Sequence, residues 1–380
     1  MRNDMETYLL RTEGMDVGYH GVPLIRDITI QVKKGEILTL IGPNGSGKST
    51  ILKSLIGQLS LLAGTVFLDG QDMGAMGVRE AARRLSILMT ERVRPERMTC
   101  GDVVAAGRYP YTGRLGVLSK RDWAAVRETM ELICGQELFS TPFAQISDGQ
   151  RQRVLLARAI CQEPDVIVLD EPTTFLDIRY KMELLSILKC LVTERGLAVV
   201  MSLHELDLAQ KVSDQVLCIH DGRVERSGPP EEIFSGPYIQ KLYGITRGSY
   251  SERFGSLELE AVSGAPRVFV IGGNGSGIPV YRRLQREGVP FAAGILPEND
   301  VDYEVARALA AQVVAEEAYQ PVREETFQKA RAILSTCSQV ICCLSQFGPL
   351  NEYNRLLAQA EPQKTVFAAR TSRAGPMPAE

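Results

Sequence analysis

The sequence of 380 residues lacks any apolar run near the roughly 18–20 residues that a membrane-spanning helix needs. It also lacks a strong charge of one sign, since the formal net charge is -3 and the pI is about 5.9. Phosphate backbones call for a basic surface, so this balance argues against nucleic acid as the main partner. The first residues carry no signal-peptide pattern, and we therefore expect the chain in the cytosol.

The eight cysteines have neither C-x-x-C spacing nor neighbouring histidines. We interpret them as reduced, mostly buried small side chains rather than as metal ligands or disulfides. With 44% apolar and 23% charged residues the composition is that of an ordinary soluble protein, and the length predicts two or three domains.

One stretch matches the whole phosphate-binding pattern G-x-x-x-x-G-K-[ST]. Apolar residues 37–41 precede it and residues 51–56 follow it, which predicts a strand, a glycine loop and a helix. Glycines let backbone N–H groups turn onto an anion, and the helix adds its positive end. Lys48 would reach the β- and γ-phosphates, and the Ser49 hydroxyl would ligate Mg²⁺. The predicted phosphate-binding residues are Gly42, Pro43, Asn44, Gly45, Ser46, Gly47, Lys48, Ser49 and Thr50.

A second apolar run, residues 166–169, ends in Asp170 and Glu171. Such a run predicts a strand buried on both faces, which delivers both carboxylates to the ligand-binding edge of a sheet. Asp170 fits a Mg²⁺-side carboxylate acting through water, and Glu171 fits the base that polarises the attacking water. The next predicted strand brings His204 to the same edge, where it would bond the γ-phosphate or that water, or cap a helix.

Two further positions are candidate nucleotide contacts. Residues 8–32 alternate apolar and polar types, which predicts antiparallel strands, and Tyr19 lies in a turn-rich part of them. Its ring would stack on adenine, worth roughly 1–3 kcal/mol, or pack at a strand edge. Ser147 and Gly149 begin a predicted helix whose free N–H groups suit an anion, although a capped helix without a ligand is the alternative.

The pattern divides the chain into a first domain, residues 1–245, and a last one, residues 266–380. Residues 91–163 are mainly helical and predict a subdomain inserted between core strands. Residues 246–265 are polar and rich in Gly and Ser, which predicts a linker. Strands then alternate with helices, which predicts a small Rossmann-like α/β domain with a parallel sheet.

A second glycine-rich turn lies in that last domain. Residues 274–277 repeat the letters N-G-S-G of residues 44–47, but Ile278 stands where Lys48 does, so this is not a second phosphate loop of the same kind. With Glu298 and Asp300 past the next strand, a dinucleotide site stays open. The alternatives are another regulatory ligand, or a dimerisation or docking module without a ligand.

The phosphate loop, Ser-x-Gly-Gln, the Asp-Glu pair, Asp177 and His204 occur in an order that resembles the ATP-binding cassette (ABC) ATPases over residues 8–245. Residues 107–110 and 172–178 are similar to those of the subunits that drive iron-siderophore, haem or cobalamin import. The resemblance implies an α/β P-loop cassette with a mixed core sheet, an antiparallel β subdomain and the helical insert. It also implies ATP and Mg²⁺ as cofactors.

The same resemblance implies a homodimer that sandwiches two ATP molecules. Ser147, Gly149 and Gln150 of one cassette would contact the γ-phosphate held by the other, and Asp177 would lie among the nucleotide-binding residues. Closure of this dimer would be passed to a separate integral membrane permease, whose contact would lie near residues 107–111. A substrate-binding protein would be an indirect partner. The chain would then work at the cytoplasmic side of the cell membrane.

Two departures from the family pattern leave a rival hypothesis open. Thr90 stands where cassettes usually have a Gln that reaches Mg²⁺, so Thr90 is the candidate metal residue there. Asp148 stands where the signature more often has Gly. The leading hypothesis is ATP hydrolysis that drives uptake of an iron chelate or cobalamin. The rival is a weakly hydrolysing, ATP-gated regulatory or docking module, and a nucleic-acid or ribosome-associated cassette is a third option, disfavoured by the acidic balance.

Overall fold

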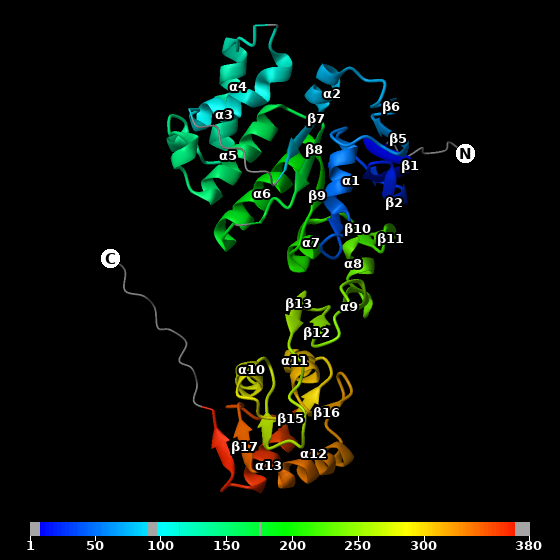
Figure 1. The fold of residues 1–380 in the computed structure, drawn as a ribbon. Helices are drawn as coiled ribbons and strands as arrows, with labels where there is room; N and C mark the ends of the chain where they lie inside the picture. Colours follow the sequence, from blue (N-terminus) through cyan, green and yellow to red (C-terminus); the bar gives the residue numbers. More distant parts are fainter. Residues whose placement is uncertain (1–7, 90–96, 114, 175, 369–380) are drawn as a thin grey trace, which may run out of the picture. The chain divides into compact units, whose positions relative to one another are not determined.

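A computed structural model describes residues 8–89, 97–113, 115–174 and 176–368. This part of the chain divides into two compact units, with the boundary between Tyr243 and Gly244. Each unit has its own sheet and hydrophobic core, and each is described by itself (Figure 1). Within the described ranges, no helix combines the length and the apolar character that a membrane span requires.

The centre of the first unit is a six-stranded sheet in the order β11-β10-β4-β9-β8-β7. Its strands are parallel except for β11, which pairs antiparallel with β10. Every residue of β4, β8 and β9 is buried, as the predicted apolar runs require. The strands are β4 (Ile37–Ile41), β7 (Leu85–Leu88), β8 (Val166–Asp170), β9 (Ala198–Ser202), β10 (Gln215–His220) and β11 (Arg223–Gly228).

A second, antiparallel sheet in this unit has the order β2-β1-β5-β6, with β3 paired to β1. It bears out the alternation of residues 8–32, because the inward-facing residues of β1 and β2 join the core together with those of β4 and α1. The strands are β1 (Leu10–Tyr19), β2 (Val22–Ile28), β3 (Gln31–Val32), β5 (Ala63–Leu68) and β6 (Gln71–Asp72).

The helices of the first unit include a cluster between β7 and β8, around α3, α4 and α5 (Figure 1). Its three α-helices each begin with a capping box, in which the N-cap and N3 side chains bond each other's backbone N–H groups. The cluster comprises α3 (Cys100–Ala105), η1 (Ala106–Tyr111), α4 (Lys120–Leu132), η2 (Gln136–Leu138), η3 (Phe143–Gln145) and α5 (Asp148–Cys161). The other helices are α1 (Lys48–Leu55), α2 (Val78–Arg84), α6 (Ile178–Arg195), α7 (Leu206–Val212), α8 (Pro230–Ile233) and α9 (Tyr238–Leu242).

The second unit has a five-stranded parallel sheet in the order β16-β15-β14-β17-β18, a doubly wound α/β arrangement. Helices α10 and α11 contribute to the core on one side, and α12 and α13 to a second core cluster. The elements are β14 (Val268–Ile271), α10 (Ile278–Arg286), β15 (Phe291–Pro297), α11 (Val301–Leu309), β16 (Gln312–Glu316), α12 (Glu324–Thr336), β17 (Gln339–Cys342), α13 (Glu352–Ala360) and β18 (Thr365–Phe367).

The segment expected as a linker, residues 246–265, contains a short hairpin. Strands β12 (Ser249–Ser251) and β13 (Ser256–Glu258) pair antiparallel, and both group with the second unit. A Gly- and Ser-rich composition fits a tight hairpin as well as a linker, which is why the sequence did not separate the two.

Candidate nucleotide-binding and catalytic site

The loop between β4 and α1 passes through positions that must be glycine. Gly42 and Gly47 have φ angles of 150° and 99°, in the region that favours glycine. A Cβ on Gly42 would lie 2.2 Å from the Ile219 carbonyl oxygen, and one on Gly47 would lie 2.5 Å from the Ile25 side chain. The glycines therefore serve the close packing of the loop as well as the approach of a ligand.

The loop offers donors that suit a phosphate group. Among the described residues none caps α1 with a side chain, so its first N–H groups remain available to an anion. The Ser46 hydroxyl is buried and has no hydrogen-bond partner among the same residues. A buried donor without an acceptor is costly, and a phosphate oxygen would satisfy it. The residues present thus fit a bound triphosphate.

Lys48 is folded into this loop. Its ammonium donates to the carbonyl oxygens of Gly42 at 2.7 Å and of Pro43 at 3.0 Å, and the residue is buried. Burial lowers the pKa of Lys48, while the negative charges of Glu171 and Asp170 act in the opposite direction. The Lys48 ammonium is therefore held at the loop, close to two carboxylates. In this position it would contact the terminal phosphates of a nucleotide bound at the loop.

Two hydroxyl groups meet the Asp170 carboxylate at the end of β8. Ser49 donates to its Oδ1 at 3.1 Å and Ser202 donates to the same oxygen at 2.8 Å. Mg²⁺ usually takes few protein oxygens and completes its shell with water and substrate phosphates, so Ser49 and Asp170 fit it. The described residues hold no group of three or more His, Cys, Asp or Glu side chains that would bind a metal by themselves.

Ser202 has no role in the sequence analysis, although it precedes His204 by two residues at the same edge of the sheet. The structure sets its strand, β9, directly beside β8, with Ser202 opposite Asp170. The Ser202 hydroxyl also accepts a hydrogen bond from the Glu171 backbone N–H at 2.9 Å. One side chain thus holds both acidic residues in place, and the signal for it was its position at the strand end.

Glu171 and His204 lie together at the same edge. His204 Nε2 is 2.5 Å from Glu171 Oε1, and the Thr174 hydroxyl donates to Glu171 Oε2 at 3.3 Å. The position that caps α7 is Glu205, so the His204 ring is directed at the glutamate instead. A carboxylate and an imidazole in contact can bind a water molecule beside them and move its proton.

The Ser147 segment forms the start of α5. The Ser147 hydroxyl accepts from the Gln150 N–H at 3.3 Å, and Gln150 Oε1 accepts from the Ser147 N–H at 2.9 Å, which makes a capping box. Ser147 is exposed, and Asp148 is turned outward in an ion pair with Arg151. A Cβ on Gly149 would lie 2.9 Å from the Tyr180 ring, so this position also needs glycine.

Three other predicted site residues have different outcomes. The hydroxyl of Tyr19 is 3.3 Å from that of Thr50, and its half-exposed ring lies beside the first turn of α1. Asp177 caps α6, where its Oδ1 accepts from the Tyr180 N–H at 3.0 Å. Thr90 lies outside the described residues, so its metal role stays a prediction.

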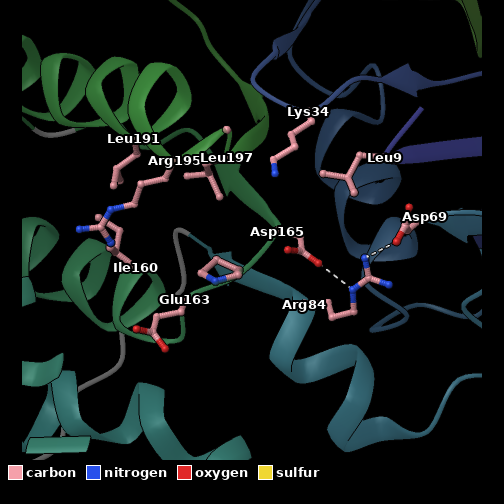
Figure 2. Close-up of a pocket in the computed structure, with 12 residues that line it drawn as sticks. Leu9, Lys34, Asp69, Arg84, Ile160, Glu163, Asp165, Leu191, Arg195 and Leu197 are labelled. Atoms are coloured by element: carbon pink, nitrogen blue, oxygen red, sulfur yellow. Dashed lines mark hydrogen bonds and ion pairs between the residues drawn. The ribbon is translucent and has the colours of Figure 1, made fainter. Parts of the chain in front are cut away.

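A cavity of about 510 Å³ opens at the opposite edge of the core sheet, near the amino ends of its strands (Figure 2). Arg84 is paired there with Asp165 at 2.6 Å and with Asp69 at 3.1 Å. Leu197 and Glu163 also line it. None of the predicted site residues lines this cavity. The candidate catalytic residues lie instead at the carboxyl ends of the strands.

The glycine-rich loop of the second unit is built differently. Its Gly273 and Gly277 N–H groups donate to Asp302 Oδ2 at 2.6 and 2.8 Å, and its Asn274 N–H donates to the Asp300 carboxylate. A Cβ on Gly277 would lie 2.4 Å from the Tyr281 hydroxyl. Carboxylates of the same chain thus occupy the amides that would face a phosphate. This arrangement disfavours the dinucleotide site that the sequence left open.

Comparison with known proteins agrees with this geometry. The family model described as ABC transporter matches residues 25–174, and the model of the MJ0874 family matches residues 291–376. The MJ0873 ABC transporter ATP-binding protein of Methanocaldococcus jannaschii is 38% identical over 289 residues, which cover 76% of this chain and 100% of the relative. A solved ATP-binding subunit of an ABC transporter aligns with a TM-score of 0.54 at 26% identity, covering 62% of this chain and 95% of its own.

Two relatives have names that include a transported solute. The cobalamin import ATP-binding protein of Halobacterium salinarum is 32% identical, covering 78% of this chain and 76% of its own. The iron(3+)-hydroxamate import ATP-binding protein of Bacillus subtilis is 34% identical, covering 62% of this chain and 88% of its own. Fold and site define a P-loop nucleoside triphosphatase of the cassette type. The chain belongs to the ABC transporter ATP-binding proteins, which are ATPases, and it carries an additional C-terminal α/β region.

Proposed function

We propose that this chain binds Mg-ATP at the loop of residues 42–50 and hydrolyses it to energise an importer of a metal chelate. The observation that carries the proposal is the convergence of Ser49, Asp170, Glu171 and His204 beside the buried Lys48. The Ser49 hydroxyl and the Asp170 carboxylate would hold Mg²⁺, which supplies positive charge against the phosphate oxygens.

In the proposed mechanism the chain's own groups act on the terminal phosphates and on the attacking water. Lys48 binds the terminal phosphates and stabilises the charge that develops there. Glu171 orients the attacking water and takes its proton at Oε1 or Oε2, while His204 holds the carboxylate in place through its 2.5 Å contact. Ser202 keeps the Glu171 backbone fixed, so the base does not depend on a flexible turn.

The active form in this proposal is a homodimer. Ser147 and Gly149 lie at the start of α5, where free N–H groups suit an anion, and Ser147 is exposed. They would meet the γ-phosphate held by the other copy, with Asp177 and Gln150 nearby. ATP would then close the dimer, and hydrolysis would release it.

A groove of about 590 Å³ is the proposed docking site for a permease segment. It lies where α1 ends and is bounded by β5, β6, α2 and β7, with Ile56, Leu61, Met73 and Met76 in its wall and Val78 87% exposed. Because α1 runs from the phosphate loop to this groove, a segment seated there would sense the state of the loop. The permease would hold the chain at the cytoplasmic face of the membrane.

The proposed solute class is an iron chelate, as siderophore or haem, or cobalamin. The names of the two solute-specific relatives support this class, as does the resemblance of residues 107–110 to importers of these solutes. A substrate-binding protein would deliver the solute to the permease. The alternative of a weakly hydrolysing regulatory module would show itself as ATP binding without steady turnover.

The test uses Glu171→Gln, which should keep ATP binding and trap the closed dimer. With Mg-ATP this variant should elute as a dimer in size-exclusion chromatography, whereas Glu194→Gln, exposed on α6, should behave as the wild type. Wild-type chain should hydrolyse Mg-ATP steadily and faster when reconstituted with the permease that co-purifies with it. A Glu171→Gln chain that stays monomeric with and without that permease would contradict the proposed mechanism.

A further inference from the structure

The first glycine of the phosphate loop is held at both polar groups of its backbone. Gly42 follows Ile41, the last residue of β4 that pairs with β10, and has a φ angle of 150°. Its N–H donates to the Tyr243 hydroxyl at 3.1 Å, and its carbonyl oxygen accepts from the Lys48 ammonium at 2.7 Å. Gly42 is buried, where an N–H without an acceptor is costly, so the orientation of this peptide depends on Tyr243.

The two contacts of Gly42 differ in what a bound nucleotide would do to them. In the proposed site Lys48 turns to the terminal phosphates, and the Gly42 carbonyl oxygen then loses that donor. Tyr243 takes no part in holding phosphate, so its bond to the Gly42 N–H can persist. Tyr243 therefore fixes the start of the loop in both the empty and the loaded site.

Tyr243 is carried by a well-anchored support. It directly follows α9, a helix that buries Tyr238, Ile239 and Leu242 in the first unit. The Arg226 guanidinium lies 3.9 Å from the centre of the Tyr238 ring and holds the start of this helix. At the other end the Tyr243 N–H donates to the Ile239 carbonyl oxygen at 3.1 Å. The backbone that carries the Tyr243 ring is thus fixed by packing and by hydrogen bonds.

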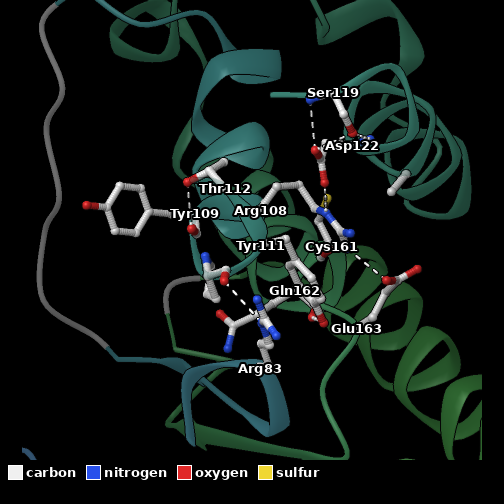
Figure 3. A network of polar contacts seen from close by, with 12 residues as sticks. Arg83, Arg108, Tyr109, Tyr111, Thr112, Ser119, Asp122, Cys161, Gln162 and Glu163 are labelled. Carbon is white, nitrogen blue, oxygen red and sulfur yellow. Dashed lines mark hydrogen bonds and ion pairs between the residues drawn. The ribbon is translucent and has the colours of Figure 1, made fainter. Parts of the chain in front are cut away.

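Another tyrosine of the same unit shows what a structural bond of this type looks like. The Tyr111 hydroxyl donates to the Gln162 carbonyl oxygen at 2.9 Å, beside the buried Arg108 (Figure 3). None of the residues labelled in Figure 3 belongs to the phosphate loop, so that bond serves the packing of the helical cluster. The Tyr243 hydroxyl instead accepts from an amide of the loop itself.

The junction between the two units adjoins this contact. The second unit begins at Gly244, the residue after Tyr243. Gly244 has a φ angle of 61°, the left-handed conformation that commonly ends a helix. A Cβ there would have no atom within 4 Å, so Gly244→Ala would strain the backbone without causing a clash. One turn therefore sets both the path into the second unit and the position of the Tyr243 ring.

We infer that Tyr243 is a positioning residue of the ATP site. Its hydroxyl orients Gly42, sets the affinity of the phosphate loop for Mg-ATP, and makes that affinity depend on the junction at Gly244. This inference rests on the proposed function and adds a residue outside the loop that tunes it. It also gives the second unit a covalent route to the nucleotide, through the peptide bond between Tyr243 and Gly244.

The experiment measures Mg-ATP hydrolysis and Mg-ATP binding by full-length variants. Tyr243→Phe removes only the hydroxyl, so KM and Kd for Mg-ATP should rise about threefold to tenfold, the range of one hydrogen bond. The kcat should stay within about twofold, because the groups that act on phosphate and water are unchanged. Tyr238→Phe on α9 is the matched control, since its hydroxyl meets Glu225 at 3.4 Å, and it should change neither constant.

A second substitution tests the junction. Gly244→Ala should raise KM and Kd by about twofold to fivefold, but should add nothing in the Tyr243→Phe background, where the hydroxyl that it displaces is absent. Additive effects of the two substitutions would show that the junction does not act through Tyr243 and would overturn that part of the inference.

The readouts separate positioning from stability. A merely structural role of Tyr243 would lower the urea midpoint of Tyr243→Phe and leave KM and Kd unchanged, which would overturn the inference. An equal rise of both constants in Tyr238→Phe would overturn it as well. Absence of hydrolysis in the wild type would refute the proposed function, while the Kd values from titration calorimetry would still decide the role of Tyr243.

Discussion

The two units carry the same four letters, N-G-S-G, in a loop after their first parallel strand, yet the two loops are bonded differently. In both loops the matching serine, Ser46 or Ser276, has a buried hydroxyl without a partner among the described residues, but the first loop also holds Lys48 within it. In the second unit the amides of Gly273 and Gly277 are already bonded to Asp302. The two loops therefore differ in the lysine and in the carboxylate that accepts from the second loop's amides.

The difference between the loops comes from one residue beside the first loop and from two residues that are distant in sequence from the second loop. Lys48 follows the glycines of the first loop directly. The carboxylates that accept from the second loop come from further along the chain: Asp300 lies 26 residues after Asn274, and Asp302 lies 25 residues after Gly277. Burial raises the pKa of Asp302, while bonds from the loop amides act in the opposite direction. The second loop therefore donates to an internal carboxylate, whereas the first loop keeps donors for the phosphate that we propose it binds.

The largest effect should come from the residue that distinguishes the loops. Lys48→Ala should lower Mg-ATP hydrolysis by on the order of 10²–10³-fold, because the charge on the terminal phosphates loses its cation. Ile278→Ala, at the matching position of the second loop, should leave hydrolysis within about twofold. Phosphate release measures both, and titration calorimetry should find one ATP per chain. A Lys48→Ala chain with wild-type turnover would break the comparison.

Asp302→Ala tests the internal carboxylate. The change leaves the buried Gly277 N–H and the part-buried Gly273 N–H without an acceptor, at about 1–3 kcal/mol each, so the free energy of unfolding of the second unit should fall by about 2–6 kcal/mol. Far-UV circular dichroism in urea follows this loss. The single tryptophan, Trp123, lies on α4 of the first unit, so its fluorescence transition should not move. An unchanged dichroism curve would argue that the loop does not need Asp302.

Gly277→Ala separates packing from ligand binding. Its Cβ would lie 2.4 Å from the Tyr281 hydroxyl, and overpacking of this kind costs about 1–3 kcal/mol. The double variant Gly277→Ala with Tyr281→Phe should recover part of the loss, because the clashing oxygen is gone. A double-mutant cycle by urea denaturation gives the coupling energy. Additive losses would mean that the glycine is needed for another reason.

The smallest effect concerns pH, where two carboxylates of the second unit behave oppositely. Hydrogen bonds from the Arg323 backbone and side chain lower the pKa of Glu316 to about 2, from 4.5. The stabilisation by ionised Glu316 is therefore full above pH 4.5 and is lost as the pH falls toward 2. Asp302 has a raised pKa, so its contribution is greatest below its ordinary pKa and declines as the pH rises.

Glu316→Gln should therefore reduce the loss of stability of the second unit as the pH falls. Asp302→Asn should reduce the loss of stability of this unit as the pH rises. Urea midpoints between pH 3 and 6, followed by dichroism, check both signs. A steeper acid loss in Glu316→Gln than in the wild type would contradict the assignment.

Much of the first unit could be predicted from the sequence because its signals are local. The apolar runs before Gly42 and Asp170 became the buried strands β4 and β8, and the carboxylates follow their strand ends as expected. The contacts between His204 and Glu171, and the part played by Ser202, depend on which strands are neighbours in the sheet. Neighbour order is set by tertiary packing, which spacing along the chain does not encode.

The second unit shows the limit more clearly. Its alternation of strands and helices predicted the parallel α/β fold correctly. Asp300 past the next strand left a dinucleotide site open in the sequence analysis, but in the structure it accepts from the Asn274 N–H of the glycine-rich loop. An aspartate at position 300, past the second strand of this unit, is compatible both with a ligand contact and with a contact to its own chain. Only the direction of the side chain decides between a ligand contact and a self-contact.

The bonded loop of the second unit has a consequence for any anion that approaches it. The amides of Gly273 and Gly277 already donate to Asp302, so a phosphate could take over their hydrogen bonds only by displacing a carboxylate that also repels it.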